Sequence, residues 1–114
     1  MIPAKEIRLA GRASDSLESL LTSSSPDLRT VAKRVHGLKA ILLADCLHGE
    51  VVPKSAIPST LRHSYGLENL YVEDLPSFWR LLYTVVRIDG QRVIVVIEIV
   101  DHRAHSKWFP GRRR

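Results

Sequence analysis

Two histidines and five cations lie together at the carboxyl end of the chain, where they could transfer protons and bind phosphate. The segment 101–114 contains five Lys or Arg residues against one Asp, which leaves a net charge of +4 with His102 and His105 neutral. Histidine suits proton transfer because its ordinary pKa of about 6.5 lies near neutral pH. Arginine suits phosphate because its guanidinium is planar and always charged. These residue types could cleave RNA without a metal, since attack by the neighbouring 2′-hydroxyl needs only a base, an acid and a cation.

The same segment also has the residue types of a zinc site. Asp101, His102 and His105 offer one carboxylate and two imidazoles. The sequence contains no second cluster of this kind, and Cys46 is the only cysteine, so one chain cannot build a site from several thiolates. We therefore interpret Asp101 as the group that orients an imidazole, and we predict neither a metal nor another cofactor.

Length and charge limit the class of protein. A chain of 114 residues is expected to form one domain, with 1–13 as an arm or a short strand and 110–114 as a basic tail. The net charge of +5 favours a polyanionic partner. Nucleic acid fits better than a membrane, because no apolar run is long enough to be a membrane span. The lone cysteine and the lack of an apolar signal-peptide core indicate the cytoplasm.

Two long apolar segments must form the scaffold that positions the charged end. Residues 78–88 and 93–100 are rich in Val, Ile and Leu and flank the dipeptide Asp89-Gly90, a pattern typical of a β-hairpin with a tight turn. Residues 69–74 are predicted to form the strand before this hairpin.

The register of the hairpin decides which residues lie near Arg80. A two-residue turn would place Arg80 alongside Asp101, whereas a one-residue bulge would shift it toward Glu98 and His102. An ion pair of Arg80 with Glu98 or Asp101 is the structural alternative to a role in chemistry.

Two helices are predicted before the sheet. Asp15 followed by Glu18 has the form of a capping box for a short helix, and Asp27 can cap a second helix of about twenty residues that Gly49 ends. The second helix has an apolar rhythm of 3.6 residues: Leu28, Val31, Val35, Leu38, Leu42 and Cys46. Its other face is basic, which indicates either a solvated surface or a flank that contacts phosphate: Arg29, Lys33, Arg34, His36 and Lys39.

The order of these elements predicts the fold class. Helices that precede a run of sequential strands favour an α+β fold, in which two N-terminal helices pack on one face of an antiparallel sheet of three to four strands. Ser59 could begin one or two further helical turns that Gly66 closes, with Tyr65 turned inward.

Several spaced residues resemble a known family of proteins. The set comprises Asn69-Leu70-Tyr71, Trp79-Arg80, Tyr83, Asp101-His102 and Phe109. This progression is similar to that of the RelE/ParE superfamily of bacterial and archaeal toxins, and most of all to its small ParE-like branch. The resemblance covers residues 57–109 in its motifs and the upstream helices in pattern only.

The resemblance implies roles for particular residues. Arg80 takes the place of the strand arginine of the ribonucleases in this superfamily, and His102 lies near their terminal histidine. His105 falls where relatives more often carry a tyrosine, and Lys54 corresponds approximately to charged residues of the loop before the sheet. We therefore predict that Arg80 binds the scissile phosphate and that His102 or His105 is the general acid or base. The predicted RNA-binding residues are Lys54, Arg103, Lys107 and Trp108, the last as a surface on which a base stacks.

Each of these residues also has an ordinary structural interpretation. His102 could cap an element or lie at the rim of the core, and His105 could be a plain surface residue. Trp108 and Phe109 could close the hydrophobic core.

The function implied by the resemblance is that of the toxin in a type II toxin–antitoxin pair. The leading prediction is a metal-independent endoribonuclease that cleaves mRNA, alone or on the ribosome. The alternatives are a non-enzymatic ParE-like inhibitor of DNA gyrase and an inactive member of the fold that binds RNA or protein. The expected partners are an antitoxin protein, mRNA with the ribosome, and a second copy of the chain, with no role for a membrane.

Overall fold

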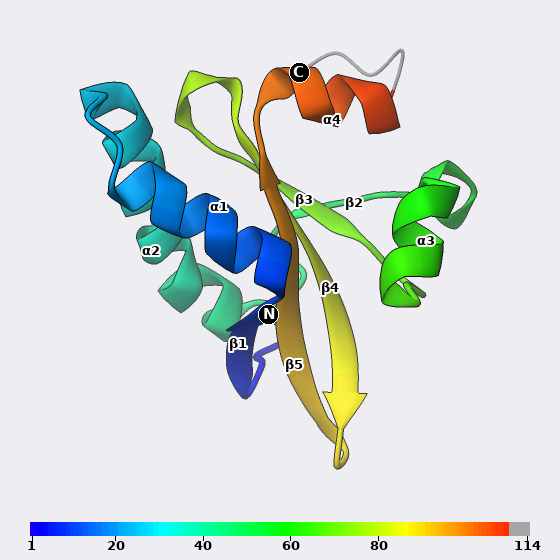
Figure 1. The fold of residues 1–114 in the computed structure, drawn as a ribbon. Helices are drawn as coiled ribbons and strands as arrows, with labels where there is room; N and C mark the ends of the chain where they lie inside the picture. The colour runs from blue at the N-terminus through cyan, green and yellow to red at the C-terminus, as the bar shows by residue number, and fades with distance from the viewer. Residues whose placement is uncertain (110–114) are drawn as a thin grey trace.

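A computed structural model describes residues 1–109 of the chain, and the predicted tail 110–114 lies outside the described residues. The fold is α+β, as predicted. Within the described residues a five-stranded sheet has the order β1-β5-β4-β3-β2 (Figure 1). Its strands are β1 (Glu6–Leu9), β2 (Glu50–Val51), β3 (Tyr71–Asp74), β4 (Arg80–Ile88) and β5 (Gln91–Val100).

The hairpin of β4 and β5 forms the centre of the sheet. Its turn is the predicted Asp89-Gly90, and both residues have positive φ, 52° and 77°, as a two-residue turn of the mirror-image type requires. The ladder runs in one register from Ile88 and Gln91 as far as Tyr83, and it then shifts by one residue. The shift leaves Ile97 without a cross-strand partner, so the strand contains a bulge.

The first strand corrects the prediction of a purely antiparallel sheet. β1 pairs with the outer edge of β5 in parallel, with Ile7 opposite Ile94. A strand of four residues shows the same alternation of side chains in either direction, so its sequence could not indicate how it pairs. Pairing here covers the edge of β5 that would otherwise expose unpaired backbone groups.

Helices cover both faces of the sheet, whereas the sequence suggested one. On one face lie α1 (Gly11–Leu21) and α2 (Pro26–Ala44); on the other lie α3 (Ser59–Tyr65) and α4 (His102–Trp108) (Figure 1). The core between the sheet and the α1/α2 pair includes Leu20, Val31, Val35, Leu38, Leu42, Leu81, Tyr83 and Ile94. The core under α3 and α4 includes Leu61, Leu70, Leu82, Ile97 and Phe109.

The ends of the two long helices differ from the prediction. α1 begins at Gly11 with Ala10 as a cap that makes no side-chain hydrogen bond, so the predicted capping box is wrong. α2 is capped by the Ser25 hydroxyl, which accepts a hydrogen bond from the Leu28 N–H at 3.4 Å. Asp27 lies in the first turn instead, because Pro26 occupies the first helical position, where its missing N–H costs nothing.

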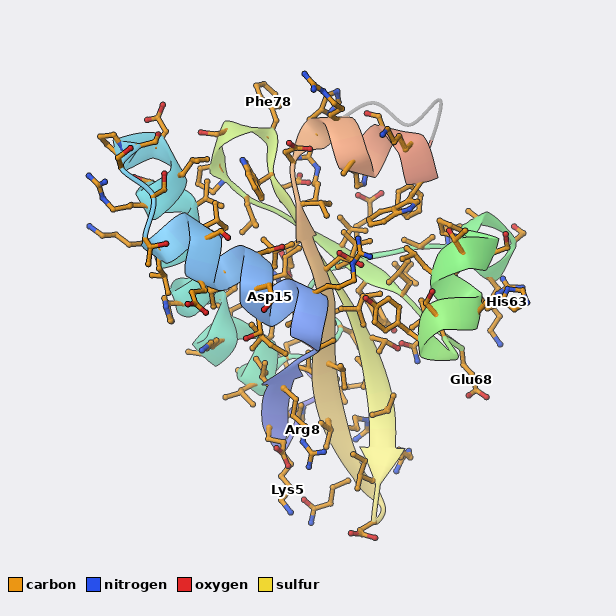
Figure 2. All side chains as sticks on the ribbon, in the orientation of Figure 1. Lys5, Arg8, Asp15, His63, Glu68 and Phe78 are labelled. Carbon is orange, nitrogen blue, oxygen red and sulfur yellow. The ribbon has the colours of Figure 1, made fainter. Side chains whose placement is uncertain are left out.

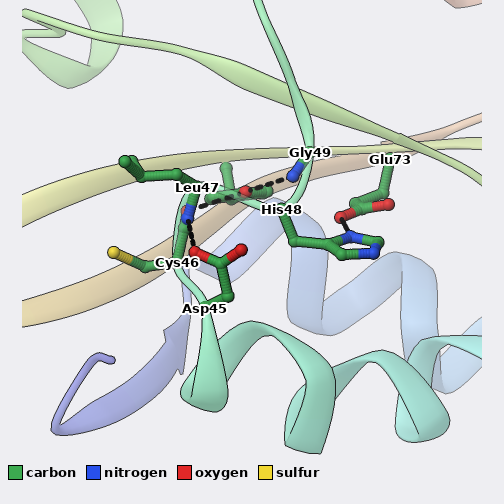
Figure 3. A network of polar contacts seen from close by, with 7 residues as sticks. Asp45, Cys46, Leu47, His48, Gly49 and Glu73 are labelled. Carbon is green, nitrogen blue, oxygen red and sulfur yellow. Dashed lines mark hydrogen bonds and ion pairs between the residues drawn. The ribbon is translucent and has the colours of Figure 1, made fainter. Parts of the chain in front are cut away.

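α2 ends at Ala44, five residues before the glycine that was expected to stop it. The chain then turns sharply, and the Asp45 carboxylate accepts a hydrogen bond from the Leu47 N–H (Figure 3). It also accepts one from the Ile2 N–H. The Tyr83 hydroxyl accepts from the Gly49 N–H at 3.0 Å and donates to the Cys46 carbonyl at 2.9 Å. One buried side chain of the sheet is therefore bonded to two backbone groups of this turn.

α4 was not predicted. Its first N–H groups are capped by the Asp101 carboxylate, which accepts from the Ala104 N–H at 3.0 Å. His105 and Phe109 lie on its buried side. Within residues 1–109, no helix combines the length and the apolar character that crossing a membrane requires.

Candidate nucleic-acid interface

Arg80 lies at the start of β4, on the sheet face that α4 covers, but it is only 3% exposed. Its Nε lies 3.0 Å from the Asp74 carboxylate, and one terminal nitrogen donates to the Trp79 carbonyl at 2.9 Å. Its neighbour across the hairpin is Val100, so the predicted partners Glu98 and Asp101 are wrong. The bulge moves the register by one residue, and the exposed Asp74 on β3 is the carboxylate within reach.

A surface pocket of about 360 Å³ lies beside Arg80, and Phe78 forms part of its wall. The Phe78 side chain is 66% exposed and points away from the molecule at the end of the sheet where α4 begins (Figure 2). Ser77 and Phe78 both have left-handed backbone conformations, with φ of 59° and 62°. A residue other than glycine in this conformation lowers the stability of the fold by about 1–3 kcal/mol, and such residues are concentrated at functional sites. Sequence reasoning placed Phe78 in a strand and so missed this exposed aromatic ring.

The two candidate histidines lie in different environments. His102, the first residue of α4, is exposed, and its ring centroid is 6.2 Å from that of Phe78 in an edge-on arrangement. His105 is buried, with its ring 4.8 Å from that of Phe109. His105 therefore does not have the surface position that its structural interpretation gave it. Its ring packs in the core with Phe109, the position that the structural alternative gave Phe109.

The predicted cations fall into two groups. Arg103 and Lys107 are exposed on α4 one turn apart, on the side of the helix opposite His105, and the exposed His102 is the first residue of the helix. Lys54 is exposed in the short turn before α3, where its carbonyl accepts a hydrogen bond from Arg62. We call His102, Arg103, Lys107 and the adjoining Phe78 the α4 surface. Its two cations, Arg103 and Lys107, lie on a helix whose other side is buried.

A second polar cluster was missed entirely by sequence reasoning. The bulge places Ile97 and Glu98 on the same face of β5, and Glu98 is 3% exposed. Its Oε2 lies 2.9 Å from the Arg12 Nε and accepts a hydrogen bond from the Tyr65 hydroxyl at 3.0 Å. Arg12 and Glu98 lie near opposite ends of the chain, so only a three-dimensional structure could join these residues.

The three tyrosines should make the stability of the protein fall at alkaline pH. Burial raises the pKa of all three, Tyr65, Tyr71 and Tyr83, above the ordinary value of about 10. For Tyr65, with the Glu98 carboxylate beside it, the pKa rises to about 12. A raised pKa contributes stability that is fully present below the unfolded value and is lost as pH rises through the folded one. The denaturant midpoint should therefore fall between about pH 10 and 12, and less steeply in Tyr65→Phe; an equal fall in both proteins would contradict this assignment.

Residues 1–109 contain no group of three His, Cys, Asp or Glu side chains placed to hold a metal ion. Comparison with known protein families, with characterised proteins and with solved structures finds no match to this chain. The case for a function therefore depends on the geometry of the residues described above.

Proposed function

We propose that this chain is a toxin-type protein of the RelE/ParE kind that acts in the cytoplasm, paired with an antitoxin, and that it binds RNA through the α4 surface. The observation that supports the proposal most strongly is the exposure of Arg103 and Lys107 on one side of a helix whose other side is buried. Their Cα atoms are separated by about 6 Å along the helix axis, so both can contact the backbone of one strand.

Phe78 adds a recognition element to these cations. Single-stranded RNA is held by phosphate contacts together with stacking of bases on aromatic rings. Phe78 presents an exposed ring beside His102, at the amino-terminal end of α4. Charge and an aromatic ring at one end of the molecule favour RNA over an acidic protein.

The burial of Arg80 and His105 favours binding over cleavage. A group that stabilises the charge growing on phosphorus must contact the phosphate. Arg80 instead contacts Asp74, and His105 packs against Phe109. Of the three residues predicted to carry the chemistry, only His102 is exposed. The alternative function, an RNA-binding member of the fold without cleavage, therefore fits the geometry best.

Cleavage of mRNA is the second candidate, and one observation favours it. Arg80 lines the same pocket as Phe78, whose ring contacts His102. A phosphate that replaced the exposed Asp74 carboxylate would bring Arg80 and His102 to one RNA strand. Inhibition of gyrase stays a prediction.

The test incubates the purified chain with a single-stranded RNA oligonucleotide and with mRNA bound to ribosomes, and it measures both binding and RNA integrity. We expect wild type to bind RNA, and we expect the RNA to stay intact with wild type and with His102→Ala alike. RNA that is cut by wild type and left intact by His102→Ala would establish the second candidate. A chain that binds no RNA in either form would overturn the proposal.

A further inference from the structure

A small pocket of about 250 Å³ lies between α3, α4 and the amino end of α1, above the bulge of β5. Its polar and aromatic lining residues are Arg12, Thr60, Ser64, Tyr65, Glu98 and Trp108. Three separate helices and the central strand meet here, so the pocket is held by the fold and not by one flexible loop. It is distinct from the α4 surface, although Trp108 is the residue next to Lys107.

The floor of the pocket is a carboxylate that keeps unused acceptor capacity. Both contacts of Glu98, with Arg12 and with Tyr65, use the same oxygen, Oε2. Among residues 1–109, Oε1 has no hydrogen-bond partner. An ionised carboxylate has about four acceptor positions and no donor, so this floor selects ligands that present N–H groups.

The wall and the mouth of the pocket supply the rest of a recognition site. Trp108 offers an aromatic face, and Thr60 and Ser64 lie one turn apart on α3 with exposed hydroxyl groups. Arg12 remains 74% exposed while its Nε holds Glu98, so its other N–H donors are available to a phosphate or a ribose.

The size of the pocket limits the ligand. Sites for drug-sized molecules have volumes of about 300–1,000 Å³, and this pocket is smaller. A single planar ring system that stacks on Trp108 is of the right size, and stacking of a nucleobase on an aromatic side chain contributes about 1–3 kcal/mol.

We propose that this pocket binds a guanine base, with its N1–H and N2–H groups donating to Glu98 and its ring on Trp108. Guanine is the nucleobase whose Watson–Crick edge carries two adjacent donors. Adenine and cytosine place a ring-nitrogen acceptor beside their single amino group, and uracil places a carbonyl on each side of its one N–H; each of these acceptors would face the carboxylate. The guanine could belong to an RNA strand or to a free nucleotide, which offer the same chemistry. If it belongs to RNA, this inference rests on the proposed function.

Calorimetric titration with GMP, AMP, CMP and UMP tests the pocket by itself. Good paired contacts to a base contribute about 1–3 kcal/mol of discrimination, so GMP should bind roughly 5- to 150-fold more tightly than the others. Glu98→Gln should remove this preference. Glu6→Gln is the matched control. Like Glu98, Glu6 pairs with an arginine, but its partner Arg8 lies on the exposed surface (Figure 2), so this variant should leave the preference for GMP intact.

Thermal unfolding separates loss of binding from loss of fold. If Glu98→Gln is unfolded, Tyr65→Phe replaces it, since it keeps the ring and removes only the hydroxyl that holds Glu98; it should bind GMP more weakly. Equal binding of all four nucleotides, or unchanged GMP preference in a folded Glu98→Gln, would overturn the inference.

Oligonucleotides distinguish the two sources of guanine and separate this inference from the proposed function. If RNA is the source, a guanine-containing oligonucleotide should bind more tightly than oligoadenylate in wild type and equally in Glu98→Gln. GMP selectivity without this difference would assign the pocket to a free nucleotide and overturn the RNA form of the inference. Failure of the α4 surface would appear separately, as RNA binding that does not respond to loss of Arg103 and Lys107.

Discussion

Replacing Arg103 and Lys107 together by glutamine should weaken the binding of single-stranded RNA about 25-fold at about 0.1 M salt. Each phosphate contact to a single strand releases counterions and contributes about 0.7 to the slope of log affinity against log salt. Loss of two contacts should therefore reduce that slope by about 1.4. At this salt concentration each lost contact should lower the affinity by a factor of about five. Both side chains are exposed on α4, so the fold should be unaffected, and anisotropy titrations at several salt concentrations provide the measurement.

Lys33→Gln with Arg34→Gln is the matched control for charge. These two residues are exposed on α2, and they belong to the basic face that the sequence left open as a phosphate-contacting flank. If RNA binds to the α4 surface, this control variant should lose much less affinity for RNA than the α4 variant. Equal losses would mean that binding responds only to net charge, and a larger loss in the control would move the interface to α2.

Tyr83→Ala should cause the largest loss of stability, about 3–5 kcal/mol, the usual range for deleting a buried aromatic side chain. The ring is fully buried and stacks on Tyr71 with centroids 5.2 Å apart. Its hydroxyl also holds the turn after α2 through Cys46 and Gly49 (Figure 3). Domains of this size have a total free energy of unfolding of only about 5–15 kcal/mol, so this variant should lose much of its stability. Urea unfolding monitored by circular dichroism measures the loss.

Tyr83→Phe isolates the contribution of the hydroxyl group. The ring stays in place, while the Gly49 N–H and the Cys46 carbonyl lose their partner. Leaving buried polar groups unpaired costs about 1–3 kcal/mol, so this variant should lie between wild type and Tyr83→Ala. A free energy of unfolding within about 1 kcal/mol of wild type for Tyr83→Ala would show that the turn and the core do not depend on this residue.

The hairpin and the long helix could be predicted from sequence because their signals are local. Asp89-Gly90 between two apolar runs determines the turn, and a periodic apolar stripe determines most of α2. Gly49 did mark a break in the chain, but for another reason than a helix stop. A side-chain carbon at Gly49 would lie 2.9 Å from the Tyr83 ring, a contact that no local pattern contains.

The end of the chain was harder to predict because its sequence was interpreted as a charged tail. Asp101 has the residue type of a helix cap, and Ala104, His105 and Trp108 follow at helical spacing, so a signal for α4 was present. The basic residues of this segment led to its interpretation as a tail instead of a helix. The parallel pairing of β1 and the ion pair of Arg12 with Glu98 join residues far apart in the chain, and the sequence holds no comparable signal for them.

Much of the resemblance to the RelE/ParE superfamily lies in residues that hold the fold together. Asn69 donates to the Val85 carbonyl and accepts from the Val85 N–H and the Thr84 hydroxyl. Tyr83 holds the turn after α2, and Phe109 is buried in the core under α4. Such residues bear on the stability of this fold more directly than on an activity, which is why the proposed function depends on exposed residues of α4.

Amide hydrogen exchange with and without a single-stranded RNA oligonucleotide tests the α4 surface most directly. Binding through this surface predicts slower exchange in α4 and in the loop that carries Phe78, with little change in β1 and α2. Slower exchange confined to α1 and α2, or no change at saturating RNA, would contradict the central claim that this face of the molecule binds RNA.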